Sequence, residues 1–88
     1  KEDFTLLLLN YILTISKHMK ECIKNEVSKL RMEIGVTQED LAEKVNVSRQ
    51  TIIALEKGNY TPSILLALKI AGFFKIPVEK IFKISYEK

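Results

Sequence analysis

The stretch from Thr37 to Gly58 constrains the fold most, because it contains two short helical patterns joined by a tight turn. Thr37 is a suitable N-cap, and the apolar residues after it recur at helical spacing. Asn46 follows this first pattern and tolerates the left-handed backbone that a sharp turn needs. Ser48 is a suitable N-cap for the second pattern, which Gly58 ends. Two short helices joined by three or four residues form a helix-turn-helix.

The second helix of this pattern begins with two side chains that can read DNA bases. Arg49 can donate two hydrogen bonds to guanine O6 and N7, and Gln50 can pair in a similar way with adenine. Ala54, one turn later, is small enough for close approach to a thymine methyl group, and Ile53 also points away from the apolar stripe. A helix that enters the major groove end-on reaches base edges with such residues. The pattern therefore indicates sequence-specific binding of double-stranded DNA.

Other polar residues around the two helices are candidates for phosphate contacts, which position a protein on DNA. Gln38 begins the first helix, where backbone and side-chain donors can bind a phosphate. The hydroxyl groups of Ser48 and Thr51 can donate in the same way. Lys57 and Asn59 follow the second helix, and a solvated loop position explains these two residue types equally well. The predicted DNA-binding set is Gln38, Ser48, Arg49, Gln50, Thr51, Ile53, Ala54, Lys57 and Asn59.

The residues from Lys24 to Phe82 resemble the Cro/repressor-type, or XRE, family of helix-turn-helix proteins. The resemblance rests on the runs TQEDLAEKV, VSRQTI, LEKG, TPS and IPVEKIF, which follow the family's order and spacing. It implies an all-α, lambda-repressor-like domain of five short helices that binds double-stranded DNA. Asn46 and Lys75 stand where the family usually has glycine, so we expect a left-handed backbone at both positions.

The resemblance also implies a structural pair between Arg31 and Glu56. Arg31 lies in the helical pattern before the motif, and Glu56 lies near the end of the reading helix. Such a pair would tie the two helices together, and breaking a partly buried pair leaves an uncompensated charge. Two independent surface charges are the alternative interpretation.

The segment before the motif divides into two parts. Residues 1–18 are nearly all apolar from Phe4 to Ile15, a pattern compatible with a buried helix or a buried strand. We expect either a segment that packs over the domain or its dimer interface, or an accessory extension, even a non-native one from an upstream start. Residues 19–88 would form the DNA-binding domain, with the motif at 37–58. Within it, the apolar spacing predicts a first helix from Cys22 to Ile34.

The segment after the motif shows two further helical patterns. Thr61 as N-cap and Pro62 at the first helical position predict a helix over residues 64–74, which is apolar almost all round. Pro77 then opens a last short helix over residues 78–82. The final residues, 83–86, alternate between polar and apolar and fit either a short strand or a tail.

Composition narrows the classes of function. The 88 residues suit one small domain, and the net charge of +3 permits nucleic-acid binding without demanding it. The single cysteine, Cys22, and the single histidine, His18, give no disulfide and no cluster with metal-ligand spacing. We therefore expect no metal and no cofactor, and the absence of a nucleophile motif argues against an enzyme. The apolar stretch is shorter than the about 20 residues of a membrane-spanning helix, so we expect a cytoplasmic protein with no membrane partner.

These patterns predict a transcriptional regulator, most simply a repressor, that binds a specific DNA site as a homodimer. The dimer interface would include the apolar helix over 64–74, the apolar stretch over 4–15, or both. The alternative is a protein-interaction module built on the same scaffold, and an antitoxin would combine both roles. DNA binding should weaken steeply as salt is added, because counterions are released, whereas an apolar protein interface should not.

Overall fold

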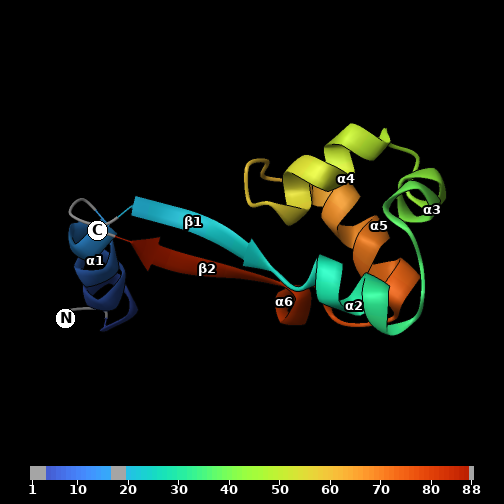
Figure 1. Ribbon diagram of the computed structural model, residues 1–88. Helices are drawn as coiled ribbons and strands as arrows, with labels where there is room; N and C mark the ends of the chain where they lie inside the picture. Colours follow the sequence, from blue (N-terminus) through green and yellow to red (C-terminus); the bar gives the residue numbers. More distant parts are fainter. Residues whose placement is uncertain (1–3, 17–19, 88) are drawn as a thin grey trace.

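The computed structural model describes residues 4–16 and 20–87, which form six helices and one two-stranded sheet (Figure 1). In chain order the elements are α1 (Phe4–Ser16), β1 (Lys20–Asn25), α2 (Val27–Glu33), α3 (Gln38–Lys44), α4 (Arg49–Glu56), α5 (Ile64–Phe74), α6 (Val78–Ile81) and β2 (Phe82–Glu87). Helices α2 to α6 gather into one group, the helical body. The two-stranded sheet of β1 and β2 leads away from it to α1, and these three elements form the arm.

This arrangement supports the predicted fold class only roughly. Five short helices do form the body, and the helix-turn-helix lies within it. The description as all-α holds only roughly, because β1 and β2 pair as a small antiparallel sheet beside the helices. A sixth helix, α1, lies at the far end of the two-stranded sheet, and the molecule is accordingly elongated, at 52 × 26 × 21 Å.

The core of the body is built from the apolar stripes of all five of its helices. Burying each large aliphatic side chain contributes about 1.5–3 kcal/mol. Val47, in the turn between α3 and α4, and Phe82, at the start of β2, pack against the core from its edges. The buried side chains are Val27, Leu41, Ala42, Val45, Ile52, Leu55, Leu66, Ile70, Ala71 and Ile81.

The predicted first helix, from Cys22 to Ile34, is wrong at both ends. Its first residues form β1, which pairs with β2 from Lys20↔Glu87 to Asn25↔Phe82. Asn25 then ends the strand: its Oδ1 accepts a hydrogen bond from the Val27 amide (3.1 Å), and its Nδ2 donates to the Leu55 carbonyl (2.9 Å). The helix begins only at Val27 and ends at Glu33. The hydrogen-bond partners of β1 lie at the other end of the chain, where local spacing gives no sign of them.

The N-cap of α5 differs from the prediction, although the helix begins at the predicted residue. The N-cap is Ser63, whose Oγ accepts a hydrogen bond from the Leu66 amide at 3.1 Å, and Thr61 and Pro62 precede the helix. A serine in that position satisfies an amide that the first turn leaves free. The helix itself spans the predicted residues and ends at Lys75, whose φ of 58° confirms the expected left-handed backbone.

The last elements settle the alternatives for the C-terminal segment. Helix α6 ends at Ile81, one residue earlier than predicted, because Phe82 already has an extended backbone and begins β2. Of the two interpretations of residues 83–86, the strand is correct.

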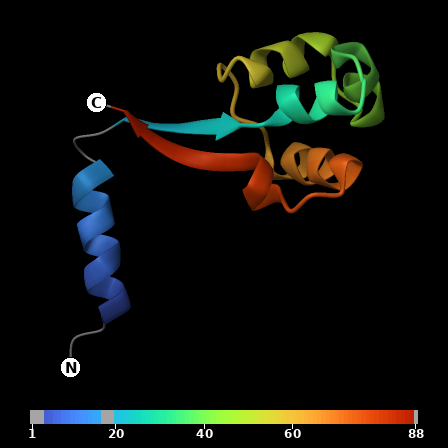
Figure 2. The same cartoon turned by 60° about the horizontal axis from the view of Figure 1, so that its bottom comes forward.

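The N-terminal apolar stretch forms a helix, α1, which stands apart from the helical body (Figure 2). Its large apolar side chains from Phe4 to Leu13 are all exposed, by 41% at Ile12 and by up to 77% at Phe4. The expected burial of this stretch is thus not achieved within a single chain. The other residues of the predicted segment 1–18, which are 1–3, 17 and 18, lie outside the described residues. Within residues 4–16 and 20–87, no helix is both long and apolar enough to cross a membrane.

Candidate nucleic-acid interface

The two helices of the motif are joined by a turn that fixes their relative orientation. Asn46 adopts a φ of 60°, as its place in the sequence predicts, and the Val47 amide donates to the Ala42 carbonyl at 2.9 Å. The turn therefore folds back onto the end of α3. Ser48 follows with an extended backbone, and its Oγ accepts a hydrogen bond from the Thr51 amide at 3.2 Å. The predicted cap of α4 is confirmed.

The other end of this pair is capped as firmly. The Asp40 amide donates to Thr37 Oγ1 at 3.0 Å, and the Thr37 amide donates to Asp40 Oδ2 at 3.3 Å. This reciprocal arrangement is a capping box, and it satisfies two donors that the first turn would otherwise leave free. Together the two caps hold the start of α3 and the start of α4 in defined positions.

Helix α4 buries one face and exposes the other. Ile52 and Leu55 are fully buried, which orients the helix on the core. Arg49 and Gln50 are exposed in the first turn, and Ile53 and Ala54 are half-buried beside the exposed face. A helix held in this way presents its N-terminal side chains outward, and these are the side chains that the sequence assigned to base contacts.

Glu56, at the last turn of α4, joins three parts of the body. Arg31 of α2 donates to both of its carboxylate oxygens, from Nε to Oε2 at 2.8 Å and from Nη2 to Oε1 at 3.2 Å. Arg31 Nη1 also donates to the Val36 carbonyl at 2.9 Å. The side chains of Arg31 and Glu56 are only 13% and 7% exposed. The predicted structural pair is confirmed, and it locks the end of the reading helix to α2.

The hydrogen bonds from the Arg31 side chain to Glu56 raise the pKa of Arg31 above its ordinary value, against the opposing effect of burial, and the charge of Glu56 adds to the rise. The hydrogen bonds to Glu56 and the negative charge of Glu56 both favour the charged form of the guanidinium. Arg31 therefore stays cationic, and the pair holds as a fixed structural link.

The predicted phosphate-contact residues fall into two groups, one at the starts of α3 and α4 and one after the end of α4. Gln38, Ser48 and Thr51 lie near the starts of α3 and α4, whereas Lys57 and Asn59 follow the end of α4. The starts of the two helices share one surface hollow, to which Gln38 and Arg49 both contribute. Because an eight-residue helix is about 12 Å long, the two groups could flank one face of the reading helix.

The first group already has partners within the protein. The Gln38 amide donates from Nε2 to Glu56 Oε1 at 3.0 Å, a link between α3 and α4 that the sequence analysis did not predict. The hydroxyl groups of Ser48 and Thr51 lie 3.0 Å apart and share a hydrogen bond. These side chains are consequently held in place before any ligand binds. A distant glutamate is not visible in the local pattern around Gln38, so sequence reasoning could not find this link.

The second group, Lys57 and Asn59, lies near the two-stranded sheet. Lys57 and Asn59 are exposed, and the Asn59 amide donates to the Ala54 carbonyl at 2.9 Å. Lys57 lines a hollow with residues 22–25 of β1, among them Lys24. Sequence reasoning missed Lys24 at this surface because it placed that residue on a helix.

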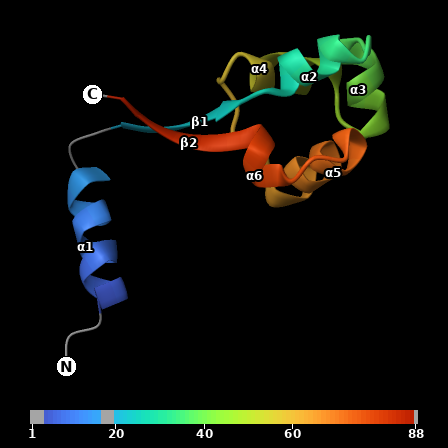
Figure 3. The same ribbon diagram turned by 90° about the horizontal axis from the view of Figure 1, so that it is seen from below.

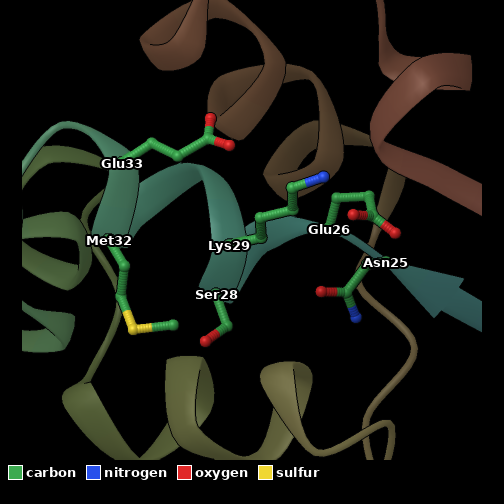
Figure 4. A pocket seen from close by; sticks show the side chains of 6 residues that line it. All are labelled: Asn25, Glu26, Ser28, Lys29, Met32 and Glu33. Carbon is green, nitrogen blue, oxygen red and sulfur yellow. The ribbon is translucent and has the colours of Figure 1, made fainter.

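A different hollow lies along the outer side of α2 and is lined by polar and charged side chains (Figure 4). The side chains of Ser28 and Met32 point to one side of α2 and that of Glu33 points to the other, so the three do not converge on a common centre. The described parts of the chain also contain no group of three side chains that could hold a metal ion. The exposed surface of the helix-turn-helix is thus the better candidate for function.

Comparisons with known proteins agree with this geometry. The family model described as helix-turn-helix matches residues 27–81, which run from the start of α2 to the end of α6. A protein of Methanocaldococcus jannaschii named as an HTH-type transcriptional regulator is 57% identical over 60 residues, or 68% of this chain and 91% of that protein. The HTH-type transcriptional regulator YgzD of Bacillus subtilis is 49% identical over 65 residues, or 74% of this chain and 98% of that protein.

A solved structure shares the fold. The crystal structure of the transcriptional regulator VanUg superposes with a TM-score of 0.63 at 24% identity, and the match covers 76% of this chain and 89% of that chain.

Proposed function

The chain belongs to the helix-turn-helix family, in its Cro/repressor or XRE type, and on that basis we propose that it binds specific sites on double-stranded DNA as a homodimer and represses transcription. Membership of this family of DNA-binding transcriptional regulators also means that the chain is not an enzyme, as the sequence analysis predicted. The observation that carries the proposal is the exposed first turn of α4, where Arg49 and Gln50 extend from a helix that is fixed by buried Ile52 and Leu55.

Sequence-specific recognition follows from the chemistry of these exposed residues. Arg49 and Gln50 offer the paired donors and acceptors that distinguish guanine and adenine in the major groove. Ile53 and Ala54, which are half-buried at the edge of the same face, provide apolar contact for a thymine methyl group. Since Glu56 and the core fix the helix, little conformational freedom is lost on binding, and the base contacts can contribute fully to affinity.

Phosphate contacts from both ends of α4 would position the domain. At the start of α3, the backbone amide of Gln38 and the second hydrogen of its side-chain amide can face a phosphate, while the first hydrogen is donated to Glu56 at the end of α4. The hydroxyl groups of Ser48 and Thr51 add further polar atoms at the start of α4. At the other end, exposed Lys57 and Asn59 flank the groove. These contacts set the register of the protein on DNA, whereas the base contacts set its preference.

A homodimer is supported by an exposed apolar surface on α5. The side chains of Ile64, Leu65 and Leu68 are 81%, 64% and 54% exposed, although they lie on a helix that the body otherwise buries at Leu66 and Ile70. Two copies related by two-fold symmetry would place their α4 helices in successive major grooves, about 34 Å apart. A dimer that covers two turns of a promoter blocks access by polymerase, which is the reason for proposing repression.

Selection of binding sites from random duplex DNA tests the proposal directly. The purified chain should enrich a two-fold symmetric sequence, and its affinity should fall steeply between low and physiological salt. A reporter carrying the selected sequence over its promoter should lose expression when the protein is present. Failure to enrich any sequence, together with salt-independent binding to a protein partner, would favour the interaction module instead. Enrichment with increased reporter expression would retain DNA binding and reject repression.

A further inference from the structure

The arm exposes more apolar surface than a monomer normally leaves in water. Eight large apolar side chains of α1 are each at least 41% exposed, from Phe4 to Leu13. Together they offer on the order of 800 Å², which is the area that one partner contributes to a standard protein interface. The largest apolar patch on a typical monomer is about 300–600 Å². The surface of α1 therefore has the size of an interface.

The two-stranded sheet adds a second apolar surface to the arm. In an antiparallel pair, directly opposed residues lie on the same face, so Ile23, Ile84 and Tyr86 share one side of the sheet. Ile84 is 61% exposed and Tyr86 is 37% exposed. A two-stranded sheet is only marginally stable in water without further packing. Figure 3 shows the two-stranded sheet extending out of the helical body, with α1 beyond it. The body contacts the sheet where Phe82 packs on the core and where Lys57 and Thr61 line hollows with β1, and Ile84 and Tyr86 still remain exposed.

The chemistry of α1 identifies what would cover this surface. The helix is FTLLLLNYILTIS and contains no charged residue. A helix that lies in a membrane surface needs a charged polar face, usually with Lys or Arg, opposite its apolar face. With 13 residues at about 1.5 Å each, α1 is about 20 Å long, whereas the hydrocarbon core of a bilayer is about 30 Å thick. An apolar protein surface of similar size fits it better than lipid does.

We propose that the arm is a dimerisation arm, in which α1 and the apolar face of the two-stranded sheet pack against the same two surfaces of a second copy of this chain. A second copy is the one partner whose apolar surface is known to match in size, because a two-fold interface brings a surface onto itself. The choice of this partner rests on the proposed function, since reading two successive major grooves also requires two copies.

The arrangement has a geometric consequence. The arm leads away from the body (Figure 2), so a joint at the arms leaves both α4 helices free to face DNA. An all-round apolar helix is covered only if it contacts more than one neighbour. In the dimer, α1 would lie between the partner's α1 and the partner's two-stranded sheet. Each sheet would then gain the helix packing that it lacks in a single chain.

Polar substitutions in the full chain test the arm. Replacing Leu6, Leu9 and Leu13 together with Gln should weaken self-association by about 100-fold or more in sedimentation equilibrium. The comparison variant is Leu65→Gln with Leu68→Gln on α5, the other exposed apolar surface, which should weaken self-association much less if the arm is the main contact. The control is Met32→Gln on α2, which is 64% exposed and belongs to neither surface, so it should leave self-association unchanged. All three variants should keep a cooperative melt and bind a single half-site as wild type does. If the α5 variant dissociates and the α1 variant does not, the arm proposal is overturned.

A cysteine placed at the middle of α1 tests the two-fold contact independently. In a Cys22→Ser background, Leu9→Cys should form an intermolecular disulfide rapidly under mild oxidation. Glu79→Cys, at an exposed position of α6, is the control and should react far more slowly. Equal rates for the two variants would overturn the proposal.

A lipid partner and a failure of the proposed function have distinct outcomes. Wild-type chain that sediments as a monomer and floats with vesicles of phosphatidylcholine and phosphatidylglycerol would overturn the arm as a dimer contact. Wild-type chain that dimerises through α1 but enriches no DNA sequence would support the arm and reject the proposed function. Chain that binds a selected site as a dimer insensitive to the α1 substitutions would keep the function and reject the arm.

Discussion

The helical body and the arm use apolar residues in opposite ways. In the body, the large side chains Leu41, Ile52, Leu55, Ile70 and Ile81 are fully buried, and each helix contributes at least one residue to the same core. In the arm, every large apolar side chain from Phe4 to Leu13 is exposed by two-fifths or more, and Ile84 of the two-stranded sheet is 61% exposed. The body is thus complete within one chain, and the arm is not.

This difference also separates the two roles that we propose for the protein, DNA reading and self-association. Residues that face DNA need a rigid frame, and the body provides it through the caps at Thr37 and Ser48 and the link from Glu56 to Arg31. Residues that join two copies need apolar area left over after folding, and the arm provides that area. Reading and assembly can therefore be changed separately, and the following predictions use this separation.

The largest effect is expected from the core of the body. Ile52→Ala removes a fully buried side chain and should lower the free energy of unfolding by about 2–5 kcal/mol. Leu9→Ala, in the arm, is the matched comparison. The decrease in the free energy of unfolding caused by Ile52→Ala should be the same at every protein concentration. The decrease caused by Leu9→Ala should depend on protein concentration, because Leu9 acts through self-association. Denaturant unfolding at two concentrations decides between them, and identical behaviour of the two variants would contradict the separation.

The next effect concerns the link between helices. Glu56→Ala removes the acceptor for Arg31 and Gln38 together, and it should cost about 1.5–3 kcal/mol. Glu43→Ala, an exposed glutamate of α3, should change stability by less than about 0.5 kcal/mol. Thermal melts compare the two variants. Equal melting temperatures would mean that the link contributes nothing to the frame.

The pH dependence of this link follows from the raised pKa of Arg31. A group whose pKa rises on folding contributes its full stability below its pKa in the unfolded chain. That contribution is lost only as the pH passes through the raised value in the folded state. The difference in stability between wild type and Arg31→Ala that comes from the guanidinium should therefore stay constant from neutral pH to moderate alkali, as measured by denaturant unfolding across that range.

A smaller effect is expected from the base contacts. Arg49→Ala should cost about 1–3 kcal/mol on the selected site and relax the preference at one or two base pairs. Lys80→Ala, on exposed α6, removes the same charge and should leave the ranking of site variants unchanged. Competition across single-base variants measures this ranking. If the α1 variant alters the ranking as Arg49→Ala does, reading and assembly are not separate.

The smallest effect is expected at the end of α4. Lys57→Ala should weaken binding to all duplexes to a similar extent and reduce the slope of affinity against salt by about one. Its exposed position beside β1 is the reason to expect a phosphate contact. Titration at several salt concentrations gives the slope, with Lys75→Ala as a control of equal charge. An unchanged slope would leave Lys57 as a solvated loop residue.

Much of the body could be predicted from the sequence, since its signals are local. The caps of α3 and α4, the left-handed Asn46 and Lys75, and the bounds of α5 follow from residue types a few positions apart. The pair of Arg31 with Glu56 is a long-range contact, and it was predicted through the family resemblance and not from spacing. The link from Gln38 to Glu56 has no local signature and was missed.

The sequence by itself determined that two capped helices meet at a tight turn and that the second exposes Arg49 and Gln50, because capping, turn geometry and apolar spacing act over a few residues. Only the tertiary structure decided that residues 20–25 form a strand, since their hydrogen-bond partners are residues 82–87. It also decided that α1 stands outside the body with its apolar side chains exposed. An apolar stretch in a sequence indicates that its side chains are to be buried. Only the folded chain shows that the helical body does not bury those of α1.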